Sequence, residues 1–282
     1  MEDTMNEIHR FLIKLDDPNK VERKRNLQNI LQTLVKKYPP PDENTELKQN
    51  NREVCVLWNE KLHGPILKGL RDESERVREL SAETVLHFFS HMSNSSPMTL
   101  SYILPVLRQR LVHQNQDEVV EPSEEVRFLL LKILTHILQM SCKDNNEDLK
   151  IHLDDLTNMT SCCIIDSFAD IKELACNDVK LLAQAISKDF HMTAPQLINP
   201  LAKAMTHQQK KVRVACIKAV GIVIHHSGFD QFQLIASHLA QRLFDPVPDV
   251  RLAVSRVAGD LLMNWRSAMS CCSMLIPLLL TR

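Results

Sequence analysis

An aliphatic residue followed directly by a basic one recurs along the chain, and this repeat constrains the fold more than any other feature. The pairs are Val77-Arg78, Val126-Arg127, Ile171-Lys172, Val212-Arg213 and Val250-Arg251. Successive pairs lie 49, 45, 41 and 38 residues apart, and each opens an amphipathic stretch that follows a short polar turn. A period of about 40 residues is typical of arrays of two-helix units and is longer than that of ankyrin or tetratricopeptide repeats.

The spacing of apolar residues indicates that these units are helical. Apolar side chains recur three or four positions apart, for example from Leu27 to Leu34 and from Leu130 to Leu138, which places them on one face of a helix. Only five of the 282 residues are glycine, against an average usage of about 7%, whereas tight β-hairpins and phosphate-binding loops need glycine. We therefore predict an all-α protein, a HEAT/armadillo-type α-solenoid of stacked antiparallel helical hairpins.

We expect one continuous solenoid over residues 1–282, with about six hairpins and the start of a seventh. The approximate units are 1–38, 54–93, 98–140, 147–188, 194–228, 231–267 and 271–282. The polar stretches 39–53 and 114–124 are predicted to be exposed loops between helices. The final stretch, CSMLIPLLLTR, resembles a first helix without its second, so we expect the natural chain to continue past Arg282.

Acidic residues before the repeated pairs suggest how neighbouring hairpins are joined. Asp72, Asp166 and Asp245 each stand a few residues before an aliphatic-basic pair. A carboxylate there can accept hydrogen bonds from the free amides that open the second helix, or it can meet the basic residue of the pair. Stacking would align these groups as a ladder, with a weaker rung where His207 replaces the acid. The predicted ladder residues are Asp72, Arg78, Arg127, Asp166, Lys172, Arg213, Asp245 and Arg251.

The first unit is less regular, as is expected of a terminal repeat. We place Asp16-Asp17 at its turn, with Arg23 or Arg25 in the basic role. Prolines also mark the units, and we expect them early in first helices, where a missing amide costs little. These prolines are Pro65, Pro105, Pro200 and Pro277.

Charge and composition argue against several classes of partner. The net charge is -1, aromatic residues make up 5% of the chain, and basic residues gather only locally, as at Lys210, Lys211 and Arg213. Nucleic-acid binding would need many phosphate contacts and aromatic stacking, so we predict no nucleic-acid partner. No signal peptide or membrane-spanning stretch is evident, which favours a soluble, intracellular protein without a membrane partner.

No catalytic, metal or cofactor site is predicted. His87 and His91 have the one-turn spacing of some zinc ligands, but they lack the glutamate that follows the first histidine in such motifs. His225 and His226 are adjacent, so on a helix they point about 100° apart and cannot act together on one atom. None of the eight cysteines forms a C-x-x-C pair.

The second helices of a solenoid offer a surface on which a protein partner can bind. Lys210 and Lys211 open the second helix of their unit and are candidate partner contacts, whereas we assign Arg213 to the internal ladder.

Three segments resemble known repeats. They are DESERVRELSAETVL, QKKVRVACIKAVGIVI and DPVPDVRLAVSRVAGDLL, and they look like HEAT repeats. Residues 189–280, from DFHMTAPQLINPLAKAMTHQQKKVRVACIKAVGIVIHHSG to LIPLLL, are similar to the HEAT-repeat cytoplasmic assembly factors for axonemal dynein arms. Residues 1–188 match mainly as generic repeats.

The resemblance implies a non-enzymatic cytoplasmic scaffold that helps to preassemble dynein arms for motile cilia. Its implied partners are axonemal dynein chains, chaperones and other dynein assembly factors. The alternative is another HEAT-repeat adaptor, such as a nuclear-transport or phosphatase scaffold, whose repeats would look alike over the first two thirds of the chain. An enzyme is the least supported class.

Overall fold

The computed structural model describes residues 8–40, 52–92, 97–112, 120–144 and 147–279. All regular structure in these residues is helical, and they contain no strand, which confirms the predicted fold class. None of the helices in these ranges is both long and apolar enough to cross a membrane. The predicted loops 39–53 and 114–124 lie largely outside the described residues.

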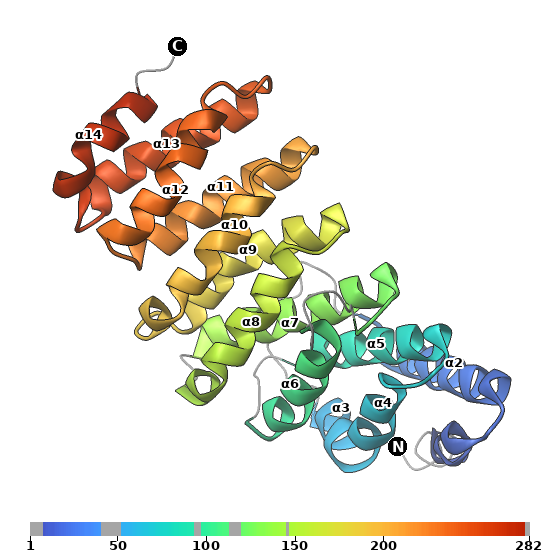
Figure 1. Cartoon of the computed structure of the whole chain (residues 1–282). Coiled ribbons are helices and arrows are strands. Elements are labelled where there is room, and N and C mark those ends of the chain that lie inside the picture. The colour runs from blue at the N-terminus through green and yellow to red at the C-terminus, as the bar shows by residue number, and fades with distance from the viewer. Residues whose placement is uncertain (1–7, 41–51, 93–96, 113–119, 145–146, 280–282) are drawn as a thin grey trace. The chain divides into compact units, whose positions relative to one another are not determined.

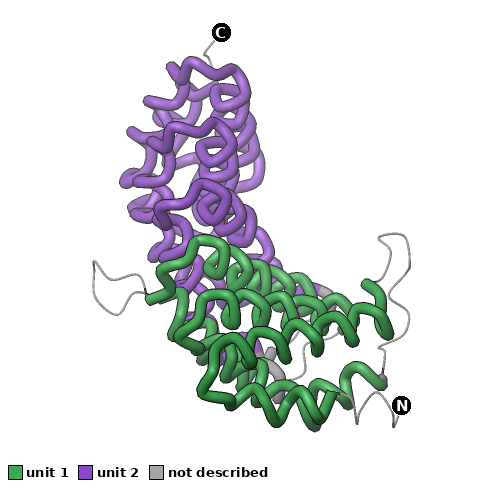
Figure 2. The backbone as a smooth tube through the Cα atoms, turned by 90° about the vertical axis from the view of Figure 1, so that its right-hand side faces the viewer, with its two compact units in different colours: residues 1–140 green, residues 141–282 purple. Residues whose placement is uncertain are grey.

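The chain divides into two compact units, residues 1–140 and 141–282, coloured separately in Figure 2. Each unit is a set of antiparallel helical hairpins (Figure 1). That the two units continue one uninterrupted solenoid stays a prediction.

Unit 1 is built from three successive hairpins. The first has the short helix η1 (Ile13–Asp16) and α2 (Lys20–Lys37). In the second, the first helix runs through α3 (Arg52–Leu57), one wide turn, η2 (Trp58–Leu62), and α4 (His63–Gly69), and it is followed by α5 (Glu75–Ser90). The third pairs α6 (Pro97–Leu111) with α7 (Glu124–Asp144), whose last residues belong to unit 2.

Unit 2 arranges its helices in two layers. First helices α8 (Leu153–Ile164), α10 (Ile198–Ala204), α12 (Phe229–Arg242) and α14 (Ala268–Leu279) contact one another in sequence order, and second helices α9 (Ala169–Ala185), α11 (Lys210–His225) and α13 (Pro248–Asn264) form the other layer (Figure 1). The short helices η3 (Glu147–His152), η4 (Phe190–Met192) and η5 (Ala194–Leu197) lie in the connections.

The repeated aliphatic residues are core residues in both units. Val77, Val126, Ile171, Val212 and Val250 are all at most 3% exposed. Burying a side chain of this size contributes about 1.5–3 kcal/mol relative to leaving it in water. The alanines five residues or less further on, Ala82, Ala215 and Ala253, are also buried, and their small side chains let neighbouring helices approach.

The prolines do not all lie where the sequence suggested. Pro200 falls in the first turn of α10, but Pro65 lies in α4, the last part of a first helix that begins at α3, and Pro105 and Pro277 lie in the second half of α6 and α14. The expectation that all four open first helices was therefore wrong, because α6 and α14 begin well before their prolines. Each of these two prolines leaves its helix without one backbone hydrogen bond.

Helices α4 and α5 approach most closely at Gly69. A Cβ atom built on Gly69 would lie 2.3 Å from the Oγ of Ser81, a buried residue. That hydroxyl already donates a hydrogen bond of 2.8 Å to the carbonyl of Val77. Glycine is therefore required here by the packing of the two helices.

Replacing Gly69 by alanine is expected to lower the free energy of unfolding by roughly 1–3 kcal/mol, because the added methyl group overlaps the Ser81 hydroxyl. Gly64→Ala in the same helix is the matched control, since a Cβ there meets no atom within 4 Å. It should be neutral or slightly stabilising. Urea denaturation followed by circular dichroism measures both, and an equal loss in the two variants would contradict the packing explanation.

Candidate functional site

In five of the described hairpins, an arginine of the second helix closes the turn between the two helices. Arg78 Nη1 donates to the carbonyls of Asp72 and Glu73, at 2.9 and 3.1 Å. Arg213 makes the same two bonds to residues 207 and 208, at 2.9 and 2.7 Å. Arg23, Arg127 and Arg251 repeat the pattern in their own turns. These bonds cover carbonyls that the first helix leaves without partners.

The first polar side chain of each turn binds the amide two residues ahead. Asp72 Oδ1 accepts from the amide of Ser74 at 2.8 Å, and Asp245 Oδ1 accepts from that of Val247 at 3.0 Å. The same bond forms at Asp17, Glu121 and Asp166, and at His207 through ring Nδ1. Such a local bond stabilises a turn and stops the first helix from continuing.

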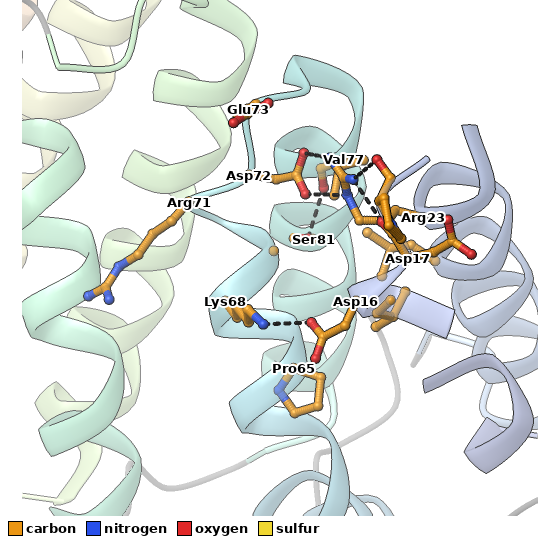
Figure 3. Close-up of a pocket in the computed structure, with 14 residues that line it drawn as sticks. Asp16, Asp17, Arg23, Pro65, Lys68, Arg71, Asp72, Glu73, Val77 and Ser81 are labelled. Atoms are coloured by element: carbon orange, nitrogen blue, oxygen red, sulfur yellow. Dashed lines mark hydrogen bonds and ion pairs between the residues drawn. The ribbon is translucent and has the colours of Figure 1, made fainter. Parts of the chain in front are cut away.

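The turn carboxylates also reach the preceding hairpin. Asp72 receives Arg23 through two bonds, Nε to Oδ2 at 2.7 Å and Nη2 to Oδ1 at 2.9 Å (Figure 3). Glu121 receives Arg78 in the same bidentate way, at 2.8 and 2.7 Å. The acid therefore pairs with the arginine of the hairpin before it, and the basic residue of its own hairpin binds the carbonyls of the turn.

The third such rung lies in unit 2. Arg213 Nη2 donates to Asp245 Oδ1 at 2.8 Å, and Arg213 Nε lies 2.8 Å from Oδ2. The two side chains are only 8% and 1% exposed. We infer that these rungs hold neighbouring hairpins in register, because a charge-assisted hydrogen bond between two such side chains has both a strong attraction and a preferred geometry.

The environment lowers the pKa of three turn carboxylates, those of Asp72, Glu121 and Asp245. Burial alone would raise the pKa of Asp245, but hydrogen bonds from Arg213 and from the amide of Val247 outweigh it, so the pKa is lowered. The pKa of Glu121 is lowered in the same way, against its burial, by bonds from Arg78 and Arg110. The stability that these groups contribute is therefore present above the ordinary carboxyl pKa and is lost as the pH falls through the lowered values.

One rung has no carboxylate. Burial lowers the pKa of Lys172, and the nearby Asp166 of its own turn only partly offsets this. The equivalent position of the next hairpin is His207, whose pKa is lowered by burial and by the charge of Lys172. His207 keeps the bond to the amide of the turn, but it supplies no negative charge to Lys172.

Sequence reasoning did not assign Glu121 to the ladder, because it placed residues 114–124 in an exposed loop. The Glu121 side chain is in fact buried, between Arg78 and Arg110. The sequence nevertheless contains a spacing that identifies Glu121 as a turn residue. In every turn described above, the residue that binds the turn amide stands six positions before the basic residue, as at 17 and 23, 72 and 78, or 121 and 127.

Lys210 and Lys211 lie on the exposed face of the second-helix layer. Lys210 Nζ is 2.9 Å from Asp249 Oδ2 in α13, and both side chains are more than half exposed. Lys211 pairs with Asp170 and, at 3.2 Å, with Glu173, both in α9. The two lysines thus bridge α11 to the second helix on either side of it.

The histidine pairs occupy packing positions. His87 lies edge-on to His91, with ring centroids 4.9 Å apart, and its buried Nε2 has no hydrogen-bond partner. Burial and the neighbouring His91 lower the pKa of His87 to about 4. His225 Nε2 lies 2.6 Å from Asp260 Oδ2 in α13, and His226 packs edge-on against a phenylalanine ring. Within the part of the chain that the structure describes, no cluster of three or more His, Cys, Asp or Glu residues could hold a metal ion.

The stacked hairpins and their turn ladder define a helical-repeat solenoid protein of the HEAT/armadillo type. Solved structures with a similar fold include an engineered protein (TM-score 0.59, 13% identity, 95% of this chain and 98% of that chain) and a designed armadillo repeat protein in complex with the peptide (KR)4 (TM-score 0.55, 14% identity, 89% and 97%). The chain belongs to the family described as dynein axonemal assembly factor 5-like, TPR repeats, whose model matches residues 14–282.

Individual relatives agree with this family. Dynein axonemal assembly factor 5 of Xenopus laevis is 35% identical over 279 residues, which cover 99% of this chain and 31% of the relative. The Homo sapiens and Mus musculus proteins of the same name are 33% and 32% identical over 275 residues, covering 97% of this chain and 31% of each relative. The chain thus spans about a third of the length of the curated relatives it matches, and the resemblance to dynein-arm assembly factors is confirmed over nearly the whole chain.

Arg213→Ala is expected to lower the free energy of unfolding by roughly 3 kcal/mol, because it removes the hydrogen bond of Arg213 to the buried Asp245 carboxylate and its bonds to two turn carbonyls. The double variant Lys210→Ala, Lys211→Ala removes only exposed ion pairs and should unfold at the wild-type urea concentration. Chemical denaturation compares the two. The reverse order of stabilities would refute the assignment of Arg213 to the interior and of the lysines to the surface.

His207→Asp is expected to stabilise the protein by about 1 kcal/mol at pH 7, because aspartate can keep the bond to the amide of Gln209 and add a charge opposite Lys172. His207→Asn is the matched control, since it offers the same turn bond without the charge. Thermal and urea unfolding would measure both variants. A gain that is equal in the two would show that the charge opposite Lys172 adds nothing.

Proposed function

We propose that the protein is a non-enzymatic cytoplasmic scaffold for the preassembly of axonemal dynein arms, which motile cilia need. The observation that carries this proposal is the name shared by the relatives, dynein axonemal assembly factor 5, at 32–35% identity over nearly the whole chain. Because the chain corresponds to about a third of each relative, the role of the whole relative is an inference for this chain.

The fold supports a binding role. In a solenoid each hairpin contacts only its neighbours, so the stack exposes a long surface instead of one enclosed pocket. Several of the described polar groups that could be mistaken for catalytic ones have structural partners. Buried arginines are paired within and between turns, and His225 is bonded to Asp260.

The proposed partners are axonemal dynein chains, chaperones or other dynein assembly factors. Lys210 and Lys211 are proposed contacts, since they are exposed on the second-helix layer and their ion pairs are open to solvent. A nuclear-transport or phosphatase scaffold shares only the fold class with this chain, so no specific observation favours it.

The test is affinity purification of the tagged chain from differentiating multiciliated cells, with partners identified by mass spectrometry. Axonemal dynein chains and chaperones should be recovered, and they should be depleted with the variant Lys210→Ala, Lys211→Ala. The matched control replaces Lys188 and Lys203, which are exposed outside the second-helix layer. Recovery of transport cargo or phosphatase subunits without dynein would overturn the proposal.

A further inference from the structure

A groove crosses the second-helix layer of unit 2. It has a volume of about 510 Å³ and is lined by residues of α9, α11 and α13, three helices that pack side by side. Its lining holds four basic side chains and two acidic ones, together with aliphatic and small residues. The predicted contacts Lys210 and Lys211 lie at one side of it.

The basic side chains of this groove fall into two groups. Lys210 and Lys211 are neutralised by acidic residues of the neighbouring helices. Lys218 and Arg256 are exposed, and neither has an ion pair or a side-chain hydrogen bond within the described residues. The groove therefore keeps two uncompensated positive charges on adjacent helices.

The repeat places the side chains of Lys218 and Arg256 in one row. Lys218 stands five residues after Arg213, and Arg256 stands five residues after Arg251, so both follow a ladder residue at the same distance. The equivalent residue of α9 is Asn177, which also lines the groove and is exposed. Three successive helices thus present an amide, an ammonium and a guanidinium group in register.

The spacing of such a row matches an extended peptide. Packed helices lie about 8–10 Å apart, so equivalent residues on neighbouring helices are separated by about that distance. In a polyproline II segment, residues three apart face the same side and lie about 9 Å from each other. Acidic side chains at every third position of such a segment would meet Lys218 and Arg256 in turn.

The remaining lining favours a peptide over a nucleic acid. Glu173 and Asp249 neutralise Lys211 and Lys210, so the groove keeps only two free positive charges, whereas a nucleic acid backbone needs many phosphate contacts. None of the lining residues is aromatic, so bases would have no stacking platform. Leu252, which is 49% exposed, and Val257 both line the groove, and they give aliphatic side chains of a peptide an apolar surface.

We propose that this groove binds an extended acidic segment of a protein partner, with acidic residues three positions apart and aliphatic residues between them. Lys218 and Arg256 bind the carboxylates, Asn177 bonds to the peptide backbone, and Leu252 contacts the aliphatic side chains. The proposal rests on the proposed function, because it names the chemistry of the partner that the scaffold would hold.

The first test measures binding to the intact chain by fluorescence anisotropy. The probe is a labelled peptide of about twelve residues with glutamate at every third position and leucine or valine between. Lys218→Ala with Arg256→Ala should weaken binding roughly ten-fold, since the variant loses two solvent-exposed charge pairs that each contribute modestly. Lys188→Ala with Lys203→Ala is the matched control and should bind as wild type. The difference should shrink at high salt.

Three comparisons can overturn the proposal. A peptide with glutamine in place of glutamate should bind at least ten-fold more weakly, and equal binding would refute the role of charge. A single-stranded oligonucleotide that binds tighter than the peptide, and whose affinity falls in the Lys218, Arg256 variant, would assign the groove to nucleic acid. Concentration-dependent self-association in ultracentrifugation that the same variant abolishes would assign it to a second copy of this chain.

The experiments distinguish a failure of the groove assignment from a failure of the proposed function. If the cell purification recovers dynein chains equally well with the Lys218, Arg256 variant, the groove assignment fails and the scaffold function stands. If the peptide binds as expected but no dynein component is recovered, the groove stands and the proposed function fails.

Discussion

The interaction on which the rest of the structure depends is the buried bond between an arginine and the carboxylate of the next turn. An ion pair removed from water is stable only when nearly every donor and acceptor has a partner. In the pair of Arg78 and Glu121, Arg78 meets that condition by bonding two carbonyls of its own turn as well as the carboxylate, and Glu121 also binds a backbone amide. The turn, the second helix and the next hairpin are therefore fixed by one connected set of hydrogen bonds.

This arrangement links the interior of the solenoid to its surface. Because the ladder fixes the register of α11 and α13, side chains one or two turns further along these helices, such as Lys218 and Arg256, recur at matched heights. Binding specificity in such a protein arises from rows of exposed residues, and the rows exist only because the buried turns are regular. The scaffold and the binding surface are consequences of the same repeat.

Much of this could be read from the sequence. The aliphatic members of the repeated pairs are buried as their periodicity predicts, and the all-α solenoid follows from that periodicity together with the scarcity of glycine. The sequence could not predict which arginine binds each turn carboxylate, because a linear pattern does not say whether Asp72 meets Arg78 in its own hairpin or Arg23 in the hairpin before. Glu121 was missed because a polar stretch before it suggested a loop, and burial of a glutamate is visible only once its two arginines are placed around it.

The fixed distance inside each turn has a consequence for how such a chain can change length over evolution. The distances between successive aliphatic-basic pairs vary from 38 to 49 residues, yet the first polar residue of the turn and the basic residue that binds its carbonyl are always six positions apart. The differences in length therefore lie outside the turn. There they change the size of one repeat and leave the turn of the next repeat unchanged. A lineage can lengthen one connection, or exchange its surface residues, while inheriting the same joint between neighbouring hairpins.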